Sequence, residues 1–156
     1  MRFLPRIALA FVLTYFAALV AWYFVSPDAP IWYGNLEKPH ASLPESSYFL
    51  SALVTYFFAA IALCFIWLKT PDTHTTTTWL RFYLFQLVFN AGWFMFFLGY
   101  HAIFISLIDA VFTAFIALML MMAAWEIDKR AVYFFTPYFV WTVLLVFETA
   151  IIWYLN

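Results

Sequence analysis

Polar and aromatic side chains recur at helical spacing in the third apolar stretch of this chain. Separations of four, three and four residues place four of them on one face of a helix, namely Gln86, Asn90, Trp93 and Phe97. Amide groups can meet the polar edge of a bound molecule, while indole and phenyl rings stack on its flat face. The combination is typical of a mostly apolar ligand pocket with a few placed polar groups.

The last apolar stretch shows a similar pattern, with one face that carries Tyr138, Trp141, Leu145 and Glu148. A second interpretation is available for both faces. Amide side chains in membrane helices often hydrogen-bond a neighbouring helix, for about 1 kcal/mol. An aromatic content of 25% also brings indoles together without any ligand. From the residues alone, contacts between helices explain the two faces better than a pocket does, and both interpretations stay open.

Two acidic residues interrupt the apolar stretches. A carboxylate at membrane depth costs about 2.5–3.5 kcal/mol on insertion scales, so Asp109 and Glu148 should face the bundle interior or water. Both are candidate proton or polar sites. The alternatives are a hydrogen bond to a neighbouring helix for Asp109 and contact with headgroup water for Glu148. Our hypothesis is that Glu148 lines the cavity and favours a cationic or hydrogen-bond-donating ligand group.

The sequence contains no recognisable catalytic or metal-binding machinery. Nucleophilic triads, phosphate-binding loops and runs of metal ligands are absent from it. His40 and His74 fall in expected loops and His101 in an expected tight turn, so no pair is placed to hold a haem iron from both sides. We therefore expect no catalytic residue and no metal site. A net charge of −1 without a basic cluster also argues against a nucleic-acid partner.

Five mostly apolar stretches of about twenty residues must position these side chains. With 68% apolar and 10% charged residues, the chain is suited to a membrane, and each stretch is long enough to cross a hydrocarbon core about 30 Å thick. The sequence predicts an all-α fold, an integral membrane bundle of five transmembrane helices at about residues 3–25, 48–68, 79–100, 103–125 and 132–154. Short connections leave room for a single domain, 1–156. We expect residues 75–78 to be a polar connector, and Thr73 or Thr75 to cap the third helix.

The basic residues predict the orientation of the bundle. With five membrane crossings, six of the seven basic residues lie on one side of the membrane and only Lys38 lies on the other. The positive-inside rule then places the N-terminus in the cytoplasm and loop 26–47 on the outer side, in a bacterial cell membrane. This loop holds four of the seven prolines and the Trp32–Tyr33 pair, so it is stiff enough to fold back as a lid on the ligand side. Alternatively, the two rings belong to an aromatic belt at the headgroups.

Three short runs carry a family resemblance. They read W-Y-x-x-L-E-K-P from Trp32, Q-L-x-F-N-x-x-W from Gln86 and P-Y-x-x-W from Pro137. In this order across five helices, the chain resembles the TspO family, also called tryptophan-rich sensory proteins or translocator proteins. The resemblance covers essentially the full length.

The resemblance implies a membrane receptor or binding protein for porphyrins, such as protoporphyrin IX and haem, and for related hydrophobic aromatic ligands. It implies a sensory or tetrapyrrole-handling role, with porphyrin or haem as a ligand and no obligatory cofactor. The lipid bilayer would be one partner and a second copy of the chain, in a homodimer, another. Two alternatives stay open: a transporter of such ligands, proton-linked through Asp109 and Glu148, or a light-dependent porphyrin-degrading enzyme.

Individual positions follow from the resemblance. Tyr56 replaces a pocket aromatic of the family, and Ala52 aligns with a family Trp associated with porphyrin degradation, which argues against that activity here. The family's K-P-x-W-x-P-P motif also loses its Trp, because Ala41 stands there. The full expected ligand-binding set, from the faces and the resemblance together, is Tyr33, Ala52, Tyr56, Gln86, Asn90, Trp93, Phe97, Tyr138, Trp141, Leu145 and Glu148.

Overall fold

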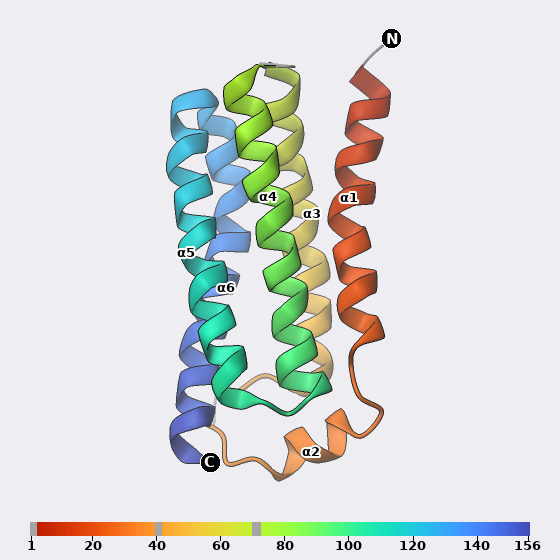
Figure 1. Ribbon diagram of the computed structural model, residues 1–156, viewed down its shortest axis with the longest axis vertical. Coiled ribbons are helices and arrows are strands. Elements are labelled where there is room, and N and C mark those ends of the chain that lie inside the picture. Colours follow the sequence, from red (N-terminus) through yellow and green to blue (C-terminus); the bar gives the residue numbers. More distant parts are fainter. Residues whose placement is uncertain (1–2, 40–41, 70–72) are drawn as a thin grey trace.

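The computed structural model describes residues 3–39, 42–69 and 73–156, so Arg2, His40 and Ala41 lie outside the described residues. Its five long helices run side by side (Figure 1): α1 (Phe3–Tyr23), α3 (Glu45–Lys69), α4 (His74–Phe94), α5 (Ile103–Ile127) and α6 (Lys129–Leu155). All five are long and apolar enough to cross a membrane. The predicted five-helix membrane bundle is confirmed, and the chain is an integral membrane protein.

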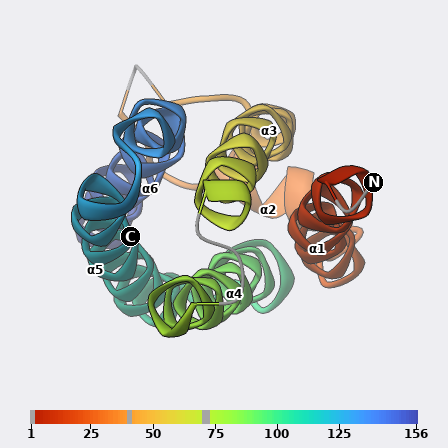
Figure 2. The ribbon, with the colours of Figure 1, turned by 90° about the horizontal axis from the view of Figure 1, so that it is seen from above.

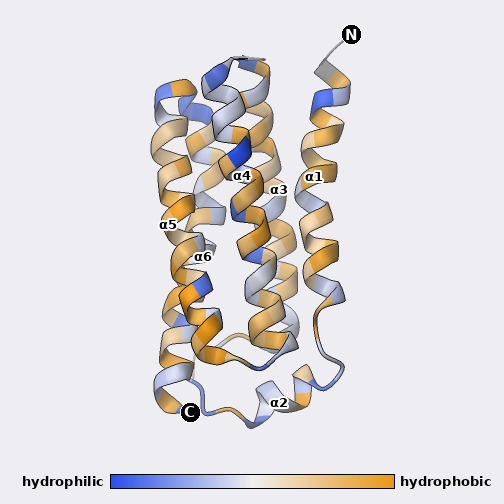
Figure 3. Cartoon of the chain, viewed as in Figure 1, coloured by the Kyte–Doolittle hydropathy of each residue, from blue (hydrophilic) through white to orange (hydrophobic). Residues whose placement is uncertain are grey.

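The order of the helices around the bundle matches their order in the chain only in part. α5 packs against α4 and α6, while α3 packs against α1 and α6, as the view along the helices shows (Figure 2). Apolar residues cover the helices along most of their length, while polar residues occur at the two ends and at several positions along α4 and α5 (Figure 3). Large exposed apolar side chains such as Phe16, Phe112 and Phe147 therefore face lipid.

Several helices begin earlier than the sequence predicts. α4 starts at His74, five residues before its expected start, and residues 75–78 are helical, so the expectation of a polar connector is wrong. The hydroxyl of Thr73 at the N-cap accepts a hydrogen bond from the backbone N–H of Thr76, at 3.2 Å. This bond satisfies a free amide at the helix start and outweighs the weak helix preference of threonine. The predicted cap at Thr73 is confirmed. Likewise, α3 begins at Glu45 and α6 at Lys129.

α4 ends in a turn of π-helix, η1 (Met95–Gly99), before the chain reverses into α5. Here Gly99 approaches the carbonyl oxygen of Phe24 so closely that a Cβ atom would collide with it. His101 follows with φ of 56°, in the left-handed region, which makes the connection to α5 tight. The same turn of π-helix carries Phe97, which is fully buried.

Loop 26–47 contains a short helix, α2 (Ala29–Asn35), that lies across one end of the bundle (Figure 1). A proline in its first turn pre-sets the helical backbone angle without losing a hydrogen bond. The ammonium of Lys38 donates to the carbonyl oxygens of Tyr33 and Leu36, the latter at 2.9 Å, and so satisfies carbonyls at the end of α2. The loop thus folds back over the bundle, while its role as a lid stays a prediction.

Candidate functional site

Five buried rings meet beneath α2, and we call them the aromatic cluster: Tyr33 from α2, Tyr48 from α3, Trp93 from α4, Phe97 from η1 and Trp141 from α6. Trp93 stacks on Phe97 with ring centroids 4.8 Å apart and planes 18° apart. The ring of Tyr48 lies 5.4 Å from that of Trp93 and 6.2 Å from that of Trp141. Stacked and tilted pairs at these separations are mutually attractive, so the five rings hold one another in place.

Hydrogen bonds hold most polar groups of the aromatic cluster in place. The Tyr33 hydroxyl donates to the carbonyl of Leu43 at 2.9 Å, so Tyr48 must be the donor in the 2.9 Å bond between the two phenols. The indole N–H of Trp93 donates to the Thr149 hydroxyl at 3.1 Å. Burial raises the pKa of Tyr33 above its ordinary value, although the bond with Tyr48 lowers it. The Tyr33 phenol is therefore neutral at physiological pH.

Two polar atoms on α6 beside the cluster have no hydrogen-bond partner among the described residues. They are the indole nitrogen of Trp141 and Oε1 of Glu148, and both are buried. The Glu148 carboxylate also interacts electrostatically with Tyr33 and Tyr48. An unsatisfied buried polar group costs about 1–3 kcal/mol. A ligand with one acceptor and one donor would relieve both costs.

Four further members of the expected ligand-binding set form a separate interior polar layer, made of Tyr56, Gln86, Asn90 and Tyr138, all fully buried. Tyr56 donates to Oδ1 of Asn90, and the amide nitrogen of Gln86 donates to the Tyr138 hydroxyl. Tyr56 and Tyr138 pack in a different apolar cluster from the aromatic cluster. From Gln86 to Phe97 a helix face extends about 16 Å, so residues that share a face need not share a pocket.

Asp109 lies inside the bundle on α5, with 7% of its surface exposed. It packs against Gly92 of α4, where an added Cβ would lie 3.0 Å from Oδ1 of Asp109. Within the described chain, its Oδ2 lacks a hydrogen-bond partner, as do Oε1 of Gln86, Nδ2 of Asn90 and Oγ1 of Thr113. These four buried atoms form an incompletely satisfied polar region in the membrane interior. The role of Asp109 as a proton site stays a prediction.

A groove of about 380 Å³ between α3 and α6 reaches the aromatic cluster at Trp141. Several residues of its lining are exposed, including Leu50, Val54 and Val140, so the groove opens towards lipid. The remaining lining residues are Ser51, Thr55, Pro137 and Leu144. Ala52 and Leu145, two further members of the expected set, are buried in the same apolar cluster as Trp93 and Trp141.

Sequence reasoning missed two residues of the site, Tyr48 and Thr149. Tyr48 precedes Ala52 by four residues and so shares its helix face, but the predicted helix began at residue 48 and left this tyrosine at the edge. Thr149 follows Leu145 by four residues and holds the indole of Trp93. In both cases the sequence offered one signal for the site, a spacing of four residues from a predicted site residue on the same helix.

The loop that carries α2 is attached to the bundle at two further points. The side chain of Asn156 accepts from the backbone N–H of Glu37 at 3.0 Å and donates to its carbonyl at 2.9 Å. Trp32 stacks on His101 with ring centroids 4.2 Å apart. A ligand that entered from this end would have to break such contacts.

Comparisons with known proteins agree with this architecture. The model of the TspO/MBR family matches residues 8–155. The tryptophan-rich protein TspO of Bacillus cereus is 24% identical over 148 residues, which cover 93% of this chain and 95% of that protein. Because the family match spans nearly the whole five-helix bundle, this chain belongs to the TspO/MBR family.

Proposed function

We propose that this TspO/MBR protein binds flat hydrophobic ligands of the porphyrin type, such as protoporphyrin IX and haem, at the aromatic cluster. Membership of the family makes the chain a membrane protein of sensory or binding type. The observation that carries the ligand class is Trp141, whose indole lies in the aromatic cluster and also lines the α3/α6 groove. Its ring offers a stacking face, and its unpaired N–H offers a donor.

The α3/α6 groove supports entry of the ligand from the bilayer. Its volume of about 380 Å³ lies within the usual range of small-molecule pockets, roughly 300–1,000 Å³. A hydrophobic macrocycle dissolved in lipid would reach Trp141 between α3 and α6 without passing α2. Further insertion would separate the rings of the aromatic cluster. Haem would be held through its macrocycle face.

A titration in the dark tests this function. Purified protein is titrated with protoporphyrin IX while quenching of tryptophan fluorescence is followed. Trp141→Phe should weaken binding about tenfold, since it removes the indole N–H and part of the stacking surface. Trp153→Phe is the matched control, because that indole lies on the same helix and is 48% exposed towards lipid. Unsaturable quenching, or equal effects of both variants, would contradict the proposal.

Proton-linked transport is a second candidate function, favoured by the incompletely satisfied polar region near Asp109. Ionisable residues inside membrane bundles commonly belong to proton relays. The test is porphyrin-driven proton flux into liposomes that contain the protein, with Asp109→Asn alongside. Flux that is lost in the variant would support transport. Binding without flux would leave the protein as a receptor.

A further inference from the structure

A second groove, of about 470 Å³, lies between α4 and α5 at the end of the bundle opposite α2. We call it the α4/α5 groove. Trp79 and Leu120 form its floor. They are held in place by a hydrogen bond from the indole N–H of Trp79 to the carbonyl of Leu120, at 3.0 Å, and both residues are only 3% exposed. Its walls include the exposed side chains of Phe82, Phe115 and Met119. The groove is therefore apolar and open to the lipid phase.

The dimensions of the α4/α5 groove match one leaflet of a bilayer. On α5 its lining runs from Phe115 to Ile127, twelve residue steps or about 18 Å of helix. Half of a hydrocarbon core about 30 Å thick is about 15 Å. The groove thus starts at the membrane surface and ends near the midplane. This is the space that one acyl chain of a lipid occupies.

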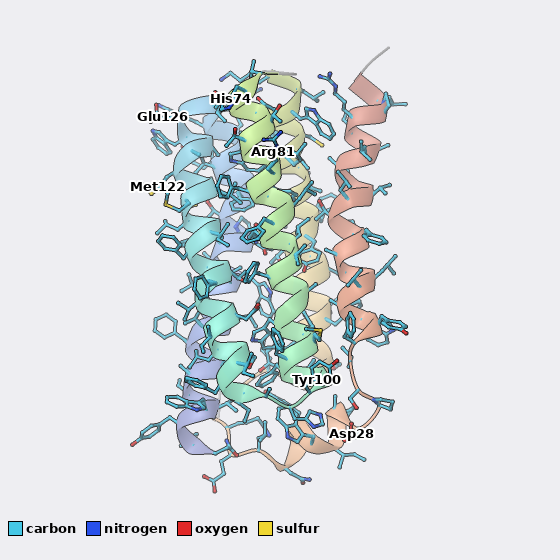
Figure 4. The ribbon with its side chains drawn as sticks, in the orientation of Figure 1. Asp28, His74, Arg81, Tyr100, Met122 and Glu126 are labelled. Carbon is cyan, nitrogen blue, oxygen red and sulfur yellow. The ribbon has the colours of Figure 1, made fainter. Side chains whose placement is uncertain are left out.

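A polar edge accompanies the groove along α4. His74, Thr78 and Arg81 recur at i, i+4 and i+7, so they lie along one edge of the helix. His74 and Thr78 line the groove, and Arg81 lies further along the helix (Figure 4). Arg81 is exposed within a membrane-spanning helix and forms no ion pair with any described residue. A cation in that position needs a counter-charge near the membrane surface.

We propose that the α4/α5 groove binds one glycerophospholipid. One acyl chain lies on the floor formed by Trp79 and Leu120 and continues towards Phe115. The long side chain of Arg81 reaches back towards the start of α4 to meet the phosphate beside the hydroxyl of Thr78. A guanidinium pairs with phosphate through two parallel hydrogen bonds, and its long side chain reaches towards the headgroups. The site shares no residue with the aromatic cluster or the α3/α6 groove. It is independent of porphyrin binding.

Native mass spectrometry of the full chain in detergent tests this proposal with two probes of equal acyl composition, dioleoylphosphatidylglycerol and dioleoylglycerol. The second probe lacks the phosphate. Wild-type protein should retain one phospholipid and bind dioleoylglycerol about tenfold more weakly, the scale of a lost charge-assisted contact. Arg81→Gln should reduce phospholipid binding to the level of dioleoylglycerol. Ala123→Trp should fill the groove and weaken both probes.

Two matched variants control for charge and bulk. Lys129→Gln removes a cation at the same end of the molecule away from the groove lining, and Val111→Trp adds an indole to the lipid-facing surface of α5 outside it. Both should bind phospholipid like the wild type, and circular dichroism checks that every variant is folded. Equal retention of the two probes, no effect of Arg81→Gln, or equal effects of Lys129→Gln and Arg81→Gln would overturn the proposal.

Discussion

Glu148 is the residue that we expect to give the aromatic cluster a charge preference. Its carboxylate interacts with the phenols of Tyr33 and Tyr48, and its Oε1 is buried without a partner among the described residues. Neither phenol has a proton left to donate to it, because Tyr33 donates to Leu43 and Tyr48 donates to Tyr33. A ligand with a cationic or donating group would supply the missing partner. This contact is the basis of the first prediction.

Glu148→Gln should change ligand choice while it preserves side-chain shape. We expect wild-type protein to prefer a porphyrin with cationic substituents over one with carboxylate substituents. The variant should lose about tenfold in affinity for the cationic porphyrin, as expected for a charge-assisted hydrogen bond. Fluorescence titrations with both porphyrins measure the preference. Glu126→Gln, at the far end of α5, is the control, and an unchanged preference in Glu148→Gln would show that the carboxylate does not face the ligand.

Two glycines, Gly99 and Gly34, allow a matched test of the close packing where the chain turns from α4 into α5. Gly99→Ala should destabilise the protein by about 1–3 kcal/mol, because the new Cβ meets the backbone carbonyl of Phe24, which cannot move alone. Gly34→Ala should be neutral or slightly stabilising, since nothing lies within 4 Å of its Cβ and α2 is helical there. Unfolding in detergent by denaturant measures both. Equal stabilities would contradict the close approach at Gly99.

At the scale of elements, the junction of α5 and α6 depends on one carboxylate. Asp128 caps α6 by accepting from the backbone N–H of Arg130 at 2.9 Å, and it pairs with the guanidinium at 2.8 Å. Lys69 at the end of α3 approaches the same carboxylate at 3.8 Å. Asp128 thus links three helices. The hydrogen bonds from Arg130 hold its pKa below the ordinary value, despite the opposing effect of burial.

The depressed pKa of Asp128 predicts an acid-dependent stability. A carboxylate with a lowered folded-state pKa stabilises the fold above its unfolded pKa of about 3.9 and loses this contribution as the pH falls through the folded value. The thermal stability of the wild type should therefore decrease once the pH drops under about 4. Asp128→Asn, which keeps the cap but loses the charge, should be less stable at pH 7 and depend less on acid. Thermal scans from pH 7 to pH 3 measure this, and parallel curves would exclude the carboxylate as a source of the dependence.

A ligand could reach the aromatic cluster either through the α3/α6 groove or past α2. Variants in each element distinguish the two routes. Val140→Trp should slow porphyrin association, because it blocks the α3/α6 groove that opens to lipid. Asn156→Ala should leave that rate unchanged, although it removes both hydrogen bonds to Glu37 and should speed hydrogen exchange in α2. Stopped-flow quenching measures the rates. Faster association in Asn156→Ala with no effect of Val140→Trp would place the entrance at α2 instead.

At the scale of the whole molecule, the two ends of the bundle differ in charge. Basic residues near the ends of the long helices, such as Arg6, Lys69 and Arg130, gather at the end opposite α2. At the α2 end, Lys38 is engaged with backbone carbonyls of its own loop. From the positive-inside rule we predict that the basic end lies in the cytoplasm and α2 on the outer side.

Labelling of single cysteines tests this orientation. In a background with Cys64→Ser, Gly34→Cys on α2 should react with a membrane-impermeant maleimide in intact bacterial cells. Glu126→Cys, at the other end of the bundle (Figure 4), should react only after lysis. Both positions are exposed, so access to the thiol is comparable. The reverse pattern would invert the membrane orientation and place α2 in the cytoplasm.

The membrane character of the chain and its five crossings were determined by the sequence alone. Both depend on local quantities, the apolar content and the length of each stretch, which need no knowledge of neighbouring segments. The family could also be recognised, because its motifs are short runs such as the one from Gln86 to Trp93. The start of α4 was harder, since the cap at Thr73 competes with the weak helix preference of the threonines that follow it.

Only the tertiary structure decided which residues share a site. Helical spacing placed Gln86 and Phe97 on one face, but different side chains of α3 and α6 meet that face along its length and divide it into a polar layer and the aromatic cluster. Packing also brought Tyr48 into the cluster and opened a lipid-facing groove beside Trp79. Such groupings depend on which helices are neighbours and how closely their backbones approach. Those relations join residues far apart in the chain, and no local pattern encodes them.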